Sequence, residues 1–268
     1  MKDSKRYLVD VGMKNLPFPM KVASRLSSEG QATIGSISVD AHITGEFEAR
    51  WIDRLIQLVH RHRNIIGTKT LKTNIQDYLK EFNDAPIKID FEYPFFVEKV
   101  TPVSKEKCLV KYSCGYSVKA SSVQKPKTVF KIEVPVITTY PQSPSTLSEM
   151  PFAQLSVVTV EVESNGEIYP EDIVELVDRH ALAPMYSFLT TEDQDFIIRK
   201  VHSQVKSSVV MIDEIKEELA HDNHILWYSV QCANFGMLHS YSTHIATEKS
   251  AWVPFSSYAE ELDNERGL

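Results

Sequence analysis

Polar and apolar side chains alternate with a period of two along four long segments of the chain, 86–98, 107–119, 128–137 and 155–163. In the first segment the apolar positions are Ile87, Ile89, Phe91 and Tyr93. Successive side chains of a strand point to opposite faces, so each segment predicts a strand with one face on a core and one in water. The pattern therefore predicts a large antiparallel sheet that is covered on one side.

Helical periodicity precedes these strands. Residues 46–62 carry apolar side chains at helical spacing, with arginines largely on the other side, and a second helix is expected over 70–82. The apolar positions of the first helix are Ile52, Leu55, Ile56 and Val59.

The second half of the chain mixes helix and strand signals. Pro170 is suited to the first turn of a helix that ends near residue 181. Thr191 followed by Gln194 resembles a capping box, which predicts another helix start. A further helix is predicted over 209–220. The last strands are predicted over 224–235 and 237–248.

The first half reads strand, strand, helix, helix, strand, strand, and the second half repeats much the same order. The halves share no detectable residue similarity. We therefore predict an α+β protein of two tandem ββααββ-like modules, residues 1–125 and 126–268, with antiparallel sheets.

The composition is that of a soluble globular protein, with 43% hydrophobic and 24% charged residues. A net charge of −7 argues against a nucleic-acid-binding surface. The sequence has no apolar run of membrane-spanning length and no signal-peptide core, which predicts a cytoplasmic protein that does not associate with membranes. Cys108 and Cys114 fall on one sheet face six residues apart, so no disulfide is expected.

Nine histidines invite a search for a metal site. The close pairs are His60/His62, His221/His224 and His239/His244. The first pair would lie about 200° apart around a helix, the second lacks a third ligand, and the third would face opposite sides of a strand. The common nucleotide-binding, hydrolase and zinc-protease motifs are absent. We interpret the acidic run 192–195 as a favourable first helical turn.

Several short segments, in order and at nearly constant spacing, resemble the type IB GTP cyclohydrolases, which are enzymes of the tunnelling fold (T-fold). The matching pieces are Asp10-Val-Gly12 with Pro17, Gln31-x-Thr33, Gly45-x-x-x-x-Arg50-Trp51, Pro141-x-Ser143, Gln154 and Asn234-Phe235-x-x-x-His239. The resemblance spans most of the chain. It implies two ββααββ-like modules whose sheets close into barrels by oligomerisation, so a homo-tetramer or homodimer is expected.

The resemblance also implies a reaction, in which a metal-bound water hydrolyses GTP to dihydroneopterin triphosphate and formate. The family's metal-binding Cys and His fall on Tyr140 and Phe152, and a second Cys of the same loop falls on Gln142. Phenol and phenyl rings do not replace thiolate and imidazole at a zinc site. We therefore expect no metal and no other cofactor.

Other site positions of the family have changed as well. Its metal-site carboxylate falls on Gln194, and its basic pair suited to phosphate falls on Thr190 and Thr191. The Glu that would hold the guanine falls on Gly236, and a His falls on Phe47. The positions that keep the family residue are Arg50, Gln154 and His239.

We therefore expect a divergent member that has lost metal-dependent GTP cyclohydrolysis, and three functions stay open. In the first, the cleft between subunits would be a repurposed enzymatic or binding site for an uncharged or aromatic small molecule, with His239 as the proton carrier. Alternatively, the chain is a non-catalytic scaffold or partner subunit, or it retains GTP cyclohydrolysis with an unusual site. The residues expected to line the cleft are Arg50, Tyr140, Gln142, Phe152, Gln154, Gln194, Gly236 and His239.

A competing interpretation exists for several of these residues. Tyr140, Phe152 and Phe47 would simply pack, and Gln194 would be the third residue of a helix cap. An open cleft beside Tyr140 would favour the repurposed site, and a filled one the non-catalytic subunit.

Overall fold

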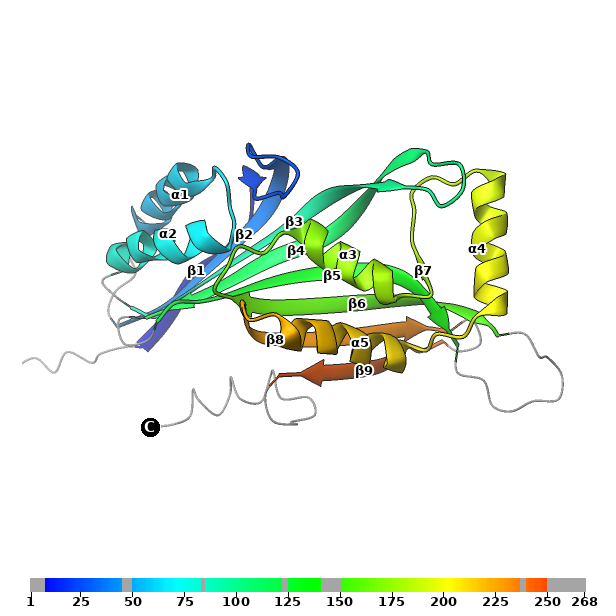
Figure 1. The fold of residues 1–268 in the computed structure, drawn as a ribbon. Coiled ribbons are helices and arrows are strands. Elements are labelled where there is room, and N and C mark those ends of the chain that lie inside the picture. Colours follow the sequence, from blue (N-terminus) through cyan, green and yellow to red (C-terminus); the bar gives the residue numbers. More distant parts are fainter. Residues whose placement is uncertain are drawn as a thin grey trace, which may run out of the picture.

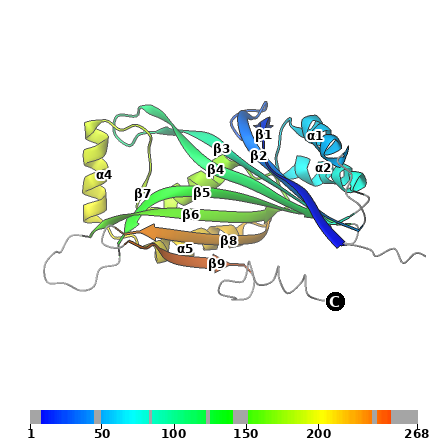
Figure 2. The ribbon, with the colours of Figure 1, turned by 180° about the vertical axis from the view of Figure 1, so that it is seen from behind.

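A computed structural model describes residues 8–44, 50–82, 85–121, 125–140, 151–236 and 240–249, with only the backbone described for 8–11, 42–44 and 50. These residues form one antiparallel sheet with helices over one face (Figures 1 and 2). The elements in chain order are β1 (Leu8–Val22), β2 (Gln31–Thr44), α1 (Arg50–His62), α2 (Thr68–Glu81), β3 (Ile87–Val100), β4 (Lys107–Ala120), β5 (Lys127–Thr139), β6 (Ala153–Ser164), α3 (Pro170–His180), β7 (Ala183–Pro184), α4 (Thr191–Ser203), α5 (Ser208–His221), β8 (Ile225–Phe235) and β9 (Thr243–Glu248).

The strands follow the order β1-β2-β3-β4-β5-β6-β8-β9, and the two-residue β7 pairs with β5. The predicted alternation is confirmed, because the apolar side of each predicted strand is buried in one core. The opposite face is turned to the viewer in Figure 2. It carries ion pairs between neighbouring positions of one strand, such as Lys131–Glu133 on β5. One dry and one wet face are the cause of the period-two pattern.

The two halves of the chain share the order predicted for the modules, but the second half has an addition. The first half is β1-β2-α1-α2-β3-β4, whereas the second has three helices and β7 between its strand pairs. The sheet continues across the predicted boundary at residue 125, because β4 pairs with β5 over Ser113–Lys119 and Lys127–Glu133. The division into 1–125 and 126–268 stays a prediction.

The predicted capping box at Thr191 and Gln194 is wrong by one residue. The N-cap of α4 is Thr190, and its partner is Asp193. Asp193 is fully buried, and it accepts hydrogen bonds from Thr190 Oγ1 (2.7 Å), Ser104 Oγ (2.6 Å) and Val103 N (2.8 Å). Burial alone would raise the pKa of this carboxyl, but the hydrogen bonds from Ser104, Thr190 and Val103 hold the pKa well below its usual range.

Helix α4 stands at one end of the sheet, beside the separating ends of the β3–β4 hairpin and β5 (Figure 1). Asp193 ties its first turn to the β3–β4 turn. The segment after it is tied to the end of β5, because Thr139 N donates to Lys206 O (2.8 Å) and Lys206 N donates to Thr139 Oγ1 (2.7 Å). The helix therefore connects the hairpin tip to the end of β5.

Two further expectations concern the chain as a whole. None of the described helices is long and apolar enough to cross a membrane. All three cysteines are buried and free, which agrees with the expected absence of disulfides.

Candidate functional site

The family-type site positions of β5, β6 and β8 meet where β5 ends. Tyr140 directly follows β5, and its backbone N–H donates to the carbonyl of Phe152 (2.7 Å). Gly236 directly follows β8, whose last residue, Phe235, pairs with Leu155 of β6. The antiparallel register therefore brings positions 140, 152 and 236 together where β5 and β8 end and β6 begins.

The Tyr140 ring lies against Gly236. A Cβ atom placed on Gly236 would be 2.6 Å from Tyr140 Cε2 and 3.1 Å from Cδ2, whereas carbon atoms in contact are normally about 3.5–4.0 Å apart. The aromatic ring at 140 thus takes the space that a side chain at 236 would need. The resemblance assigns these two positions to a Cys and a Glu, and the ring and the glycine that stand there are sterically matched.

A chain of buried hydrogen bonds lies in the neighbouring part of β5, β6 and β8. Thr138 Oγ1 and Ser156 Oγ are 2.7 Å apart, and Ser156 Oγ donates to Asn234 Oδ1 (2.7 Å). Asn234 Nδ2 donates to Ser208 Oγ at the start of α5 (3.1 Å). Gln154 Nε2 donates to Thr138 Oγ1 (3.1 Å). The polar groups of this network are buried and bond to one another.

The remaining predicted site residues are distributed over the molecule. Phe152 is 45% exposed, whereas Gln154 is buried. Gln194 is exposed in the first turn of α4, and its Nε2 donates to Leu189 O (3.4 Å). It therefore lies at the opposite end of α4 from Tyr140 within one chain. Arg50 begins α1, but its side chain lies outside the description, as do Gln142 and His239.

The described residues at the predicted site positions carry side chains that zinc does not prefer. Among the described residues no group of three or more His, Cys, Asp or Glu side chains is arranged to hold a metal ion. The matching positions offer a phenol at Tyr140, a phenyl ring at Phe152 and a neutral amide at Gln194. None of these supplies the thiolate, imidazole or carboxylate that zinc prefers.

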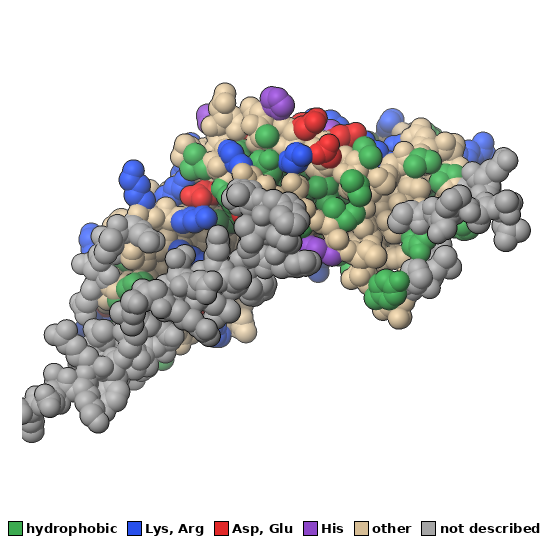
Figure 3. Space-filling model, turned by 90° about the horizontal axis from the view of Figure 1, so that it is seen from below, with side chains coloured by type: hydrophobic (Ala, Val, Ile, Leu, Met, Phe, Trp, Pro, Cys, Tyr) green, Lys and Arg blue, Asp and Glu red, His purple; other side chains and the backbone are tan. Residues whose placement is uncertain are grey.

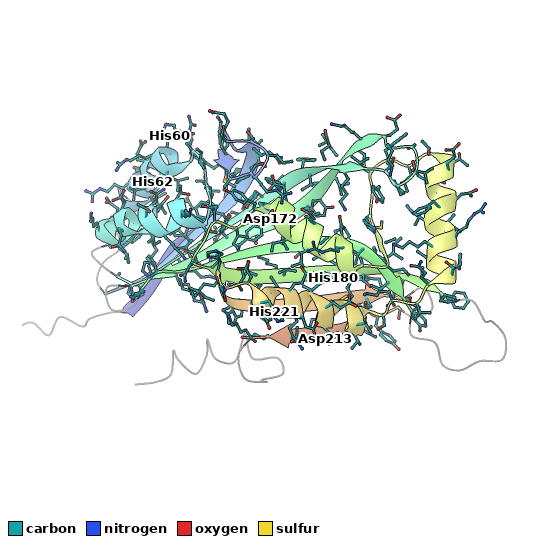
Figure 4. All side chains as sticks on the ribbon, in the orientation of Figure 1. His60, His62, Asp172, His180, Asp213 and His221 are labelled. Carbon is teal, nitrogen blue, oxygen red and sulfur yellow. The ribbon has the colours of Figure 1, made fainter. Side chains whose placement is uncertain are left out.

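Three members of the histidine pairs considered above are labelled in Figure 4, and each makes its own contact, whereas His239 lies outside the described residues. His60 packs edge-on against Phe18, with 6.3 Å between ring centroids, while His62 pairs with Asp77 (Nε2–Oδ2 3.1 Å). His221 lies at the end of α5, where its Nδ1 contacts Glu217 O (2.6 Å). These contacts agree with a packing or surface role.

A histidine that sequence reasoning missed connects two helices. His180, at the end of α3, contacts Glu214 Oε2 through Nδ1 (2.9 Å) and Glu218 Oε1 through Nε2 (2.5 Å), and both carboxylates belong to α5. The acids approach opposite sides of the ring, so the three groups do not chelate one ion. The hydrogen bond from Lys206 is the main cause that lowers the pKa of Glu214, and His180 adds to it. Glu214 and Glu218 lie one helical turn apart on the predicted helix, and this spacing was the signal in the sequence that could have indicated a paired acidic contact.

Acidic and basic side chains are mixed on the surface. In the view from below, red, blue and purple side chains interleave on one rim (Figure 3). Arg179–Glu218 and Lys206–Glu214 are pairs of this kind. Such a surface neutralises its own charge, which gives no support to nucleic-acid binding.

Gly236→Ala tests the contact with Tyr140. We expect this substitution to displace the aromatic ring and to lower the free energy of unfolding by about 1 kcal/mol, because a methyl group overpacks the site. In the Tyr140→Ala background the same change should cost little, and chemical denaturation of the four proteins of this cycle measures the coupling.

Gly166→Ala is the matched control. The atom nearest to a Cβ placed on Gly166 would be Ser164 Oγ at 3.6 Å, so the effect of this substitution should stay within about 0.5 kcal/mol. Equal effects of Gly236→Ala with and without the ring would show that Tyr140 does not occupy this space.

The sequence is similar along most of its length to known proteins. A family described as type I GTP cyclohydrolase FolE2 matches residues 1–244. A GTP cyclohydrolase FolE2 of Citrifermentans bemidjiense is 28% identical over 240 residues, which cover 90% of this chain and 89% of that protein. One of Magnetococcus marinus is 26% identical over 250 residues, covering 92% and 93% of the two chains.

The fold is similar to that of a solved enzyme structure. The uricase of Arthrobacter globiformis superposes with a TM-score of 0.53 at 11% sequence identity, over 94% of this chain and 98% of that one. At this identity the likeness concerns the fold alone. It confirms the predicted α+β T-fold with a large antiparallel sheet.

Proposed function

The chain belongs to the type I GTP cyclohydrolase FolE2 family, and from this premise we propose that it is a non-catalytic member, in which packing contacts have replaced the metal site and the guanine-holding carboxylate. In this proposal it acts as a scaffold or partner subunit, assembled with itself or with an active relative.

The packing of Tyr140 on Gly236 carries the proposal. A Glu at position 236 would have its Cβ 2.6 Å from Cε2 of the present Tyr140 ring, so the ring would have to move to admit the family's guanine anchor. The same ring stands where the family has a metal-binding thiolate. One local exchange therefore removes both a ligand of the metal and a ligand of the substrate.

The charges that the family reaction requires are absent from the matching positions too. Thr190 and Thr191, in place of a basic pair, attract no triphosphate, and Thr190 instead caps α4. Gln194 carries no negative charge for a metal. These positions form the N-cap and the first turn of α4, which supports a structural role for the segment.

The neutral polar groups of the predicted cleft give less support to a repurposed small-molecule site. Of these groups, Gln154 donates through Nε2 to Thr138 Oγ1. Asn234, on the adjacent strand β8, bonds to Ser156 and Ser208. A ligand would have to displace bonds that are already made, at a cost of about 1–3 kcal/mol for each buried group left unpaired. The role of His239 as a proton carrier stays a prediction.

Retained GTP cyclohydrolysis is the second candidate function. The relatives named above are GTP cyclohydrolases by name, and the match covers about nine-tenths of each chain. In this case, residues outside the aligned motif positions would have to supply the metal ligands.

One experiment separates the two candidates. The purified protein, supplied with zinc or manganese, is analysed for bound metal and assayed for formate release from GTP, with the Citrifermentans bemidjiense relative in parallel. We expect no stoichiometric metal and no formate above the protein-free blank. One metal ion per chain together with formate release would overturn the proposal and establish the second candidate.

A thermal-shift screen with uncharged aromatic compounds addresses the repurposed site. The non-catalytic assignment predicts no shift that depends on Tyr140. A compound that stabilises the wild type but not Tyr140→Ala would contradict it.

We further propose that the chain forms a homo-tetramer or homodimer. β1 and β9 are the two ends of the strand order, and no described strand pairs with the outer side of either. Exposed strand edges are commonly covered by a neighbouring chain. A monomer in light scattering at micromolar concentration would exclude this assembly.

A further inference from the structure

The backbone pairing between β2 and β3 stops short of the start of β2 and of the end of β3. It ends at Ser36 and Glu92, although β2 begins at Gln31 and β3 continues to Val100. Pro94 contributes to this stop, because proline has no backbone N–H to donate to a neighbouring strand. Beyond this point the β1–β2 hairpin and the β3–β4 hairpin run in different directions (Figures 1 and 2).

Side chains join the two strands where the backbone pairing has stopped. Gln31 Nε2 donates to Phe96 O (2.8 Å), and Phe96 N donates to Gln31 Oε1 (2.7 Å). Thr33 Oγ1 donates to Pro94 O (2.9 Å). The side-chain amide of Gln31 thus bonds to both backbone groups of Phe96, as a backbone partner in an antiparallel sheet does.

These side-chain bonds are out of step with the backbone pairing by one residue. Five positions separate Gln31 from Ser36, but only four separate Glu92 from Phe96. Because the register has changed, the backbone of β2 does not continue the ladder along β3. The side chain reaches farther than a backbone amide, so the bonding continues where the strands part.

The residue types suit these bonds. A primary amide carries a donor and an acceptor, so glutamine matches the N–H and the C=O of Phe96 at once, and the threonine hydroxyl supplies a donor for Pro94 O. Gln31 and Thr33 are also the two residues of one piece of the family resemblance. The candidate site described above uses neither of them, so their retention calls for another reason.

We propose that Gln31 and Thr33 form a brace, which fixes the direction in which the β1–β2 hairpin leaves the sheet. The brace follows directly after the hairpin turn, residues 23–30. At the start of the same turn, Ser24 Oγ (2.5 Å) and Arg25 N (3.2 Å) donate to Glu171 Oε1 of α3. The brace therefore holds one end of a turn whose other end contacts the second half of the chain. This role does not depend on whether the chain is catalytic.

Amide hydrogen exchange with residue resolution tests the brace. Gln31→Leu should speed exchange of the Phe96 amide about three- to tenfold, which is the change expected when one hydrogen bond of ordinary strength is lost. The amides of Ile87–Glu92, where the backbones pair, should keep their rates. An unchanged Phe96 rate would overturn the proposal, and so would an equal acceleration of all these amides, which would indicate general destabilisation.

A second variant tests whether the brace controls the turn. The double variant Gln31→Leu/Thr33→Val should also speed exchange of the Arg25 amide, which bonds to Glu171. Gln57→Leu, at an exposed position of α1, is the control and should change neither rate. An unaltered Arg25 rate in the double variant would contradict the control of the turn.

The wild-type protein alone gives a further decision if the variants fold poorly. No described strand pairs with Phe96 on the side of β2, so the brace is the reason for any slow exchange of its amide. A Phe96 amide that exchanges as fast as that of an unstructured peptide would refute the brace.

Discussion

Replacing Asp178 by Leu is expected to lower the free energy of unfolding by about 3 kcal/mol, because it leaves the charge of Lys99 buried without its partner. Lys99 Nζ lies 2.5 Å from Asp178 Oδ2, and the two side chains are only 8% and 18% exposed. Water therefore reaches little of either charge. Burial raises the pKa of Asp178, and the attraction of Lys99 opposes that rise.

The surroundings of Lys99 set the size of this effect. Its Nζ also donates to Met185 O (3.2 Å) and lies over the rings of Tyr112 and Tyr186, at 5.5 and 5.7 Å from their centroids. These contacts stay when Asp178 is replaced, and they hold the expected loss at the lower end of the range for a broken buried pair. The ion pair joins β3 to α3, and the Met185 contact adds the segment that leads to α4.

Urea denaturation of matched variants measures the loss. Glu175, on the same helix, pairs with Arg25 at 3.1 Å but is 60% exposed, so Glu175→Leu should cost no more than about 1 kcal/mol. The double variant Lys99→Met/Asp178→Leu should recover most of the loss, since it removes both charges. A cost of Asp178→Leu no greater than that of Glu175→Leu would refute the expectation.

The strands of this fold could be predicted from the sequence because one face of each strand packs on the core and the other lies in water. Ile89 and Phe91 are buried, while Lys88 and Asp90 form an ion pair on the other side. Lys99 continues the buried side of the same strand. A lysine at a core-facing position was thus a signal of a buried partner, although the alternation did not identify Asp178.

Long-range contacts explain what the sequence did not reveal. The predicted cap of α4, at Thr191 and Gln194, is wrong by one residue, because the spacing alone did not reveal the role of Asp193. Asp193 pairs with Thr190 and also accepts a hydrogen bond from Ser104 in the distant β3–β4 turn. The family resemblance marked positions 140 and 236 as changed residues. Only the contact of Tyr140, which follows β5, with Gly236, which follows β8, shows that the two residues fit each other.

Asn234→Ala is expected to cost about 2–3 kcal/mol of stability, because it leaves two buried hydroxyls, those of Ser156 and Ser208, with fewer partners. Asn234 Oδ1 accepts from Ser156 Oγ (2.7 Å) and Cys232 Sγ (3.4 Å), and its Nδ2 donates to Ser208 Oγ (3.1 Å) and Thr243 Oγ1 (3.4 Å). The residue is 3% exposed. Its side chain thus connects β6, β8, β9 and the start of α5.

Gln231→Ala is the control for this variant, because Gln231 lies on the same strand with its side chain on the opposite, partly exposed face. Its effect should stay within about 0.5 kcal/mol in the same denaturation experiment.

Asn234 is also one of the residues that carry the family resemblance, so the comparison bears on function. If Asn234 is retained for the fold, its loss lowers stability in the absence of any ligand. A ligand-binding role would instead leave the stability of the free protein nearly unchanged, and a cost for Asn234→Ala no larger than that of the control would therefore argue against the non-catalytic assignment of this network.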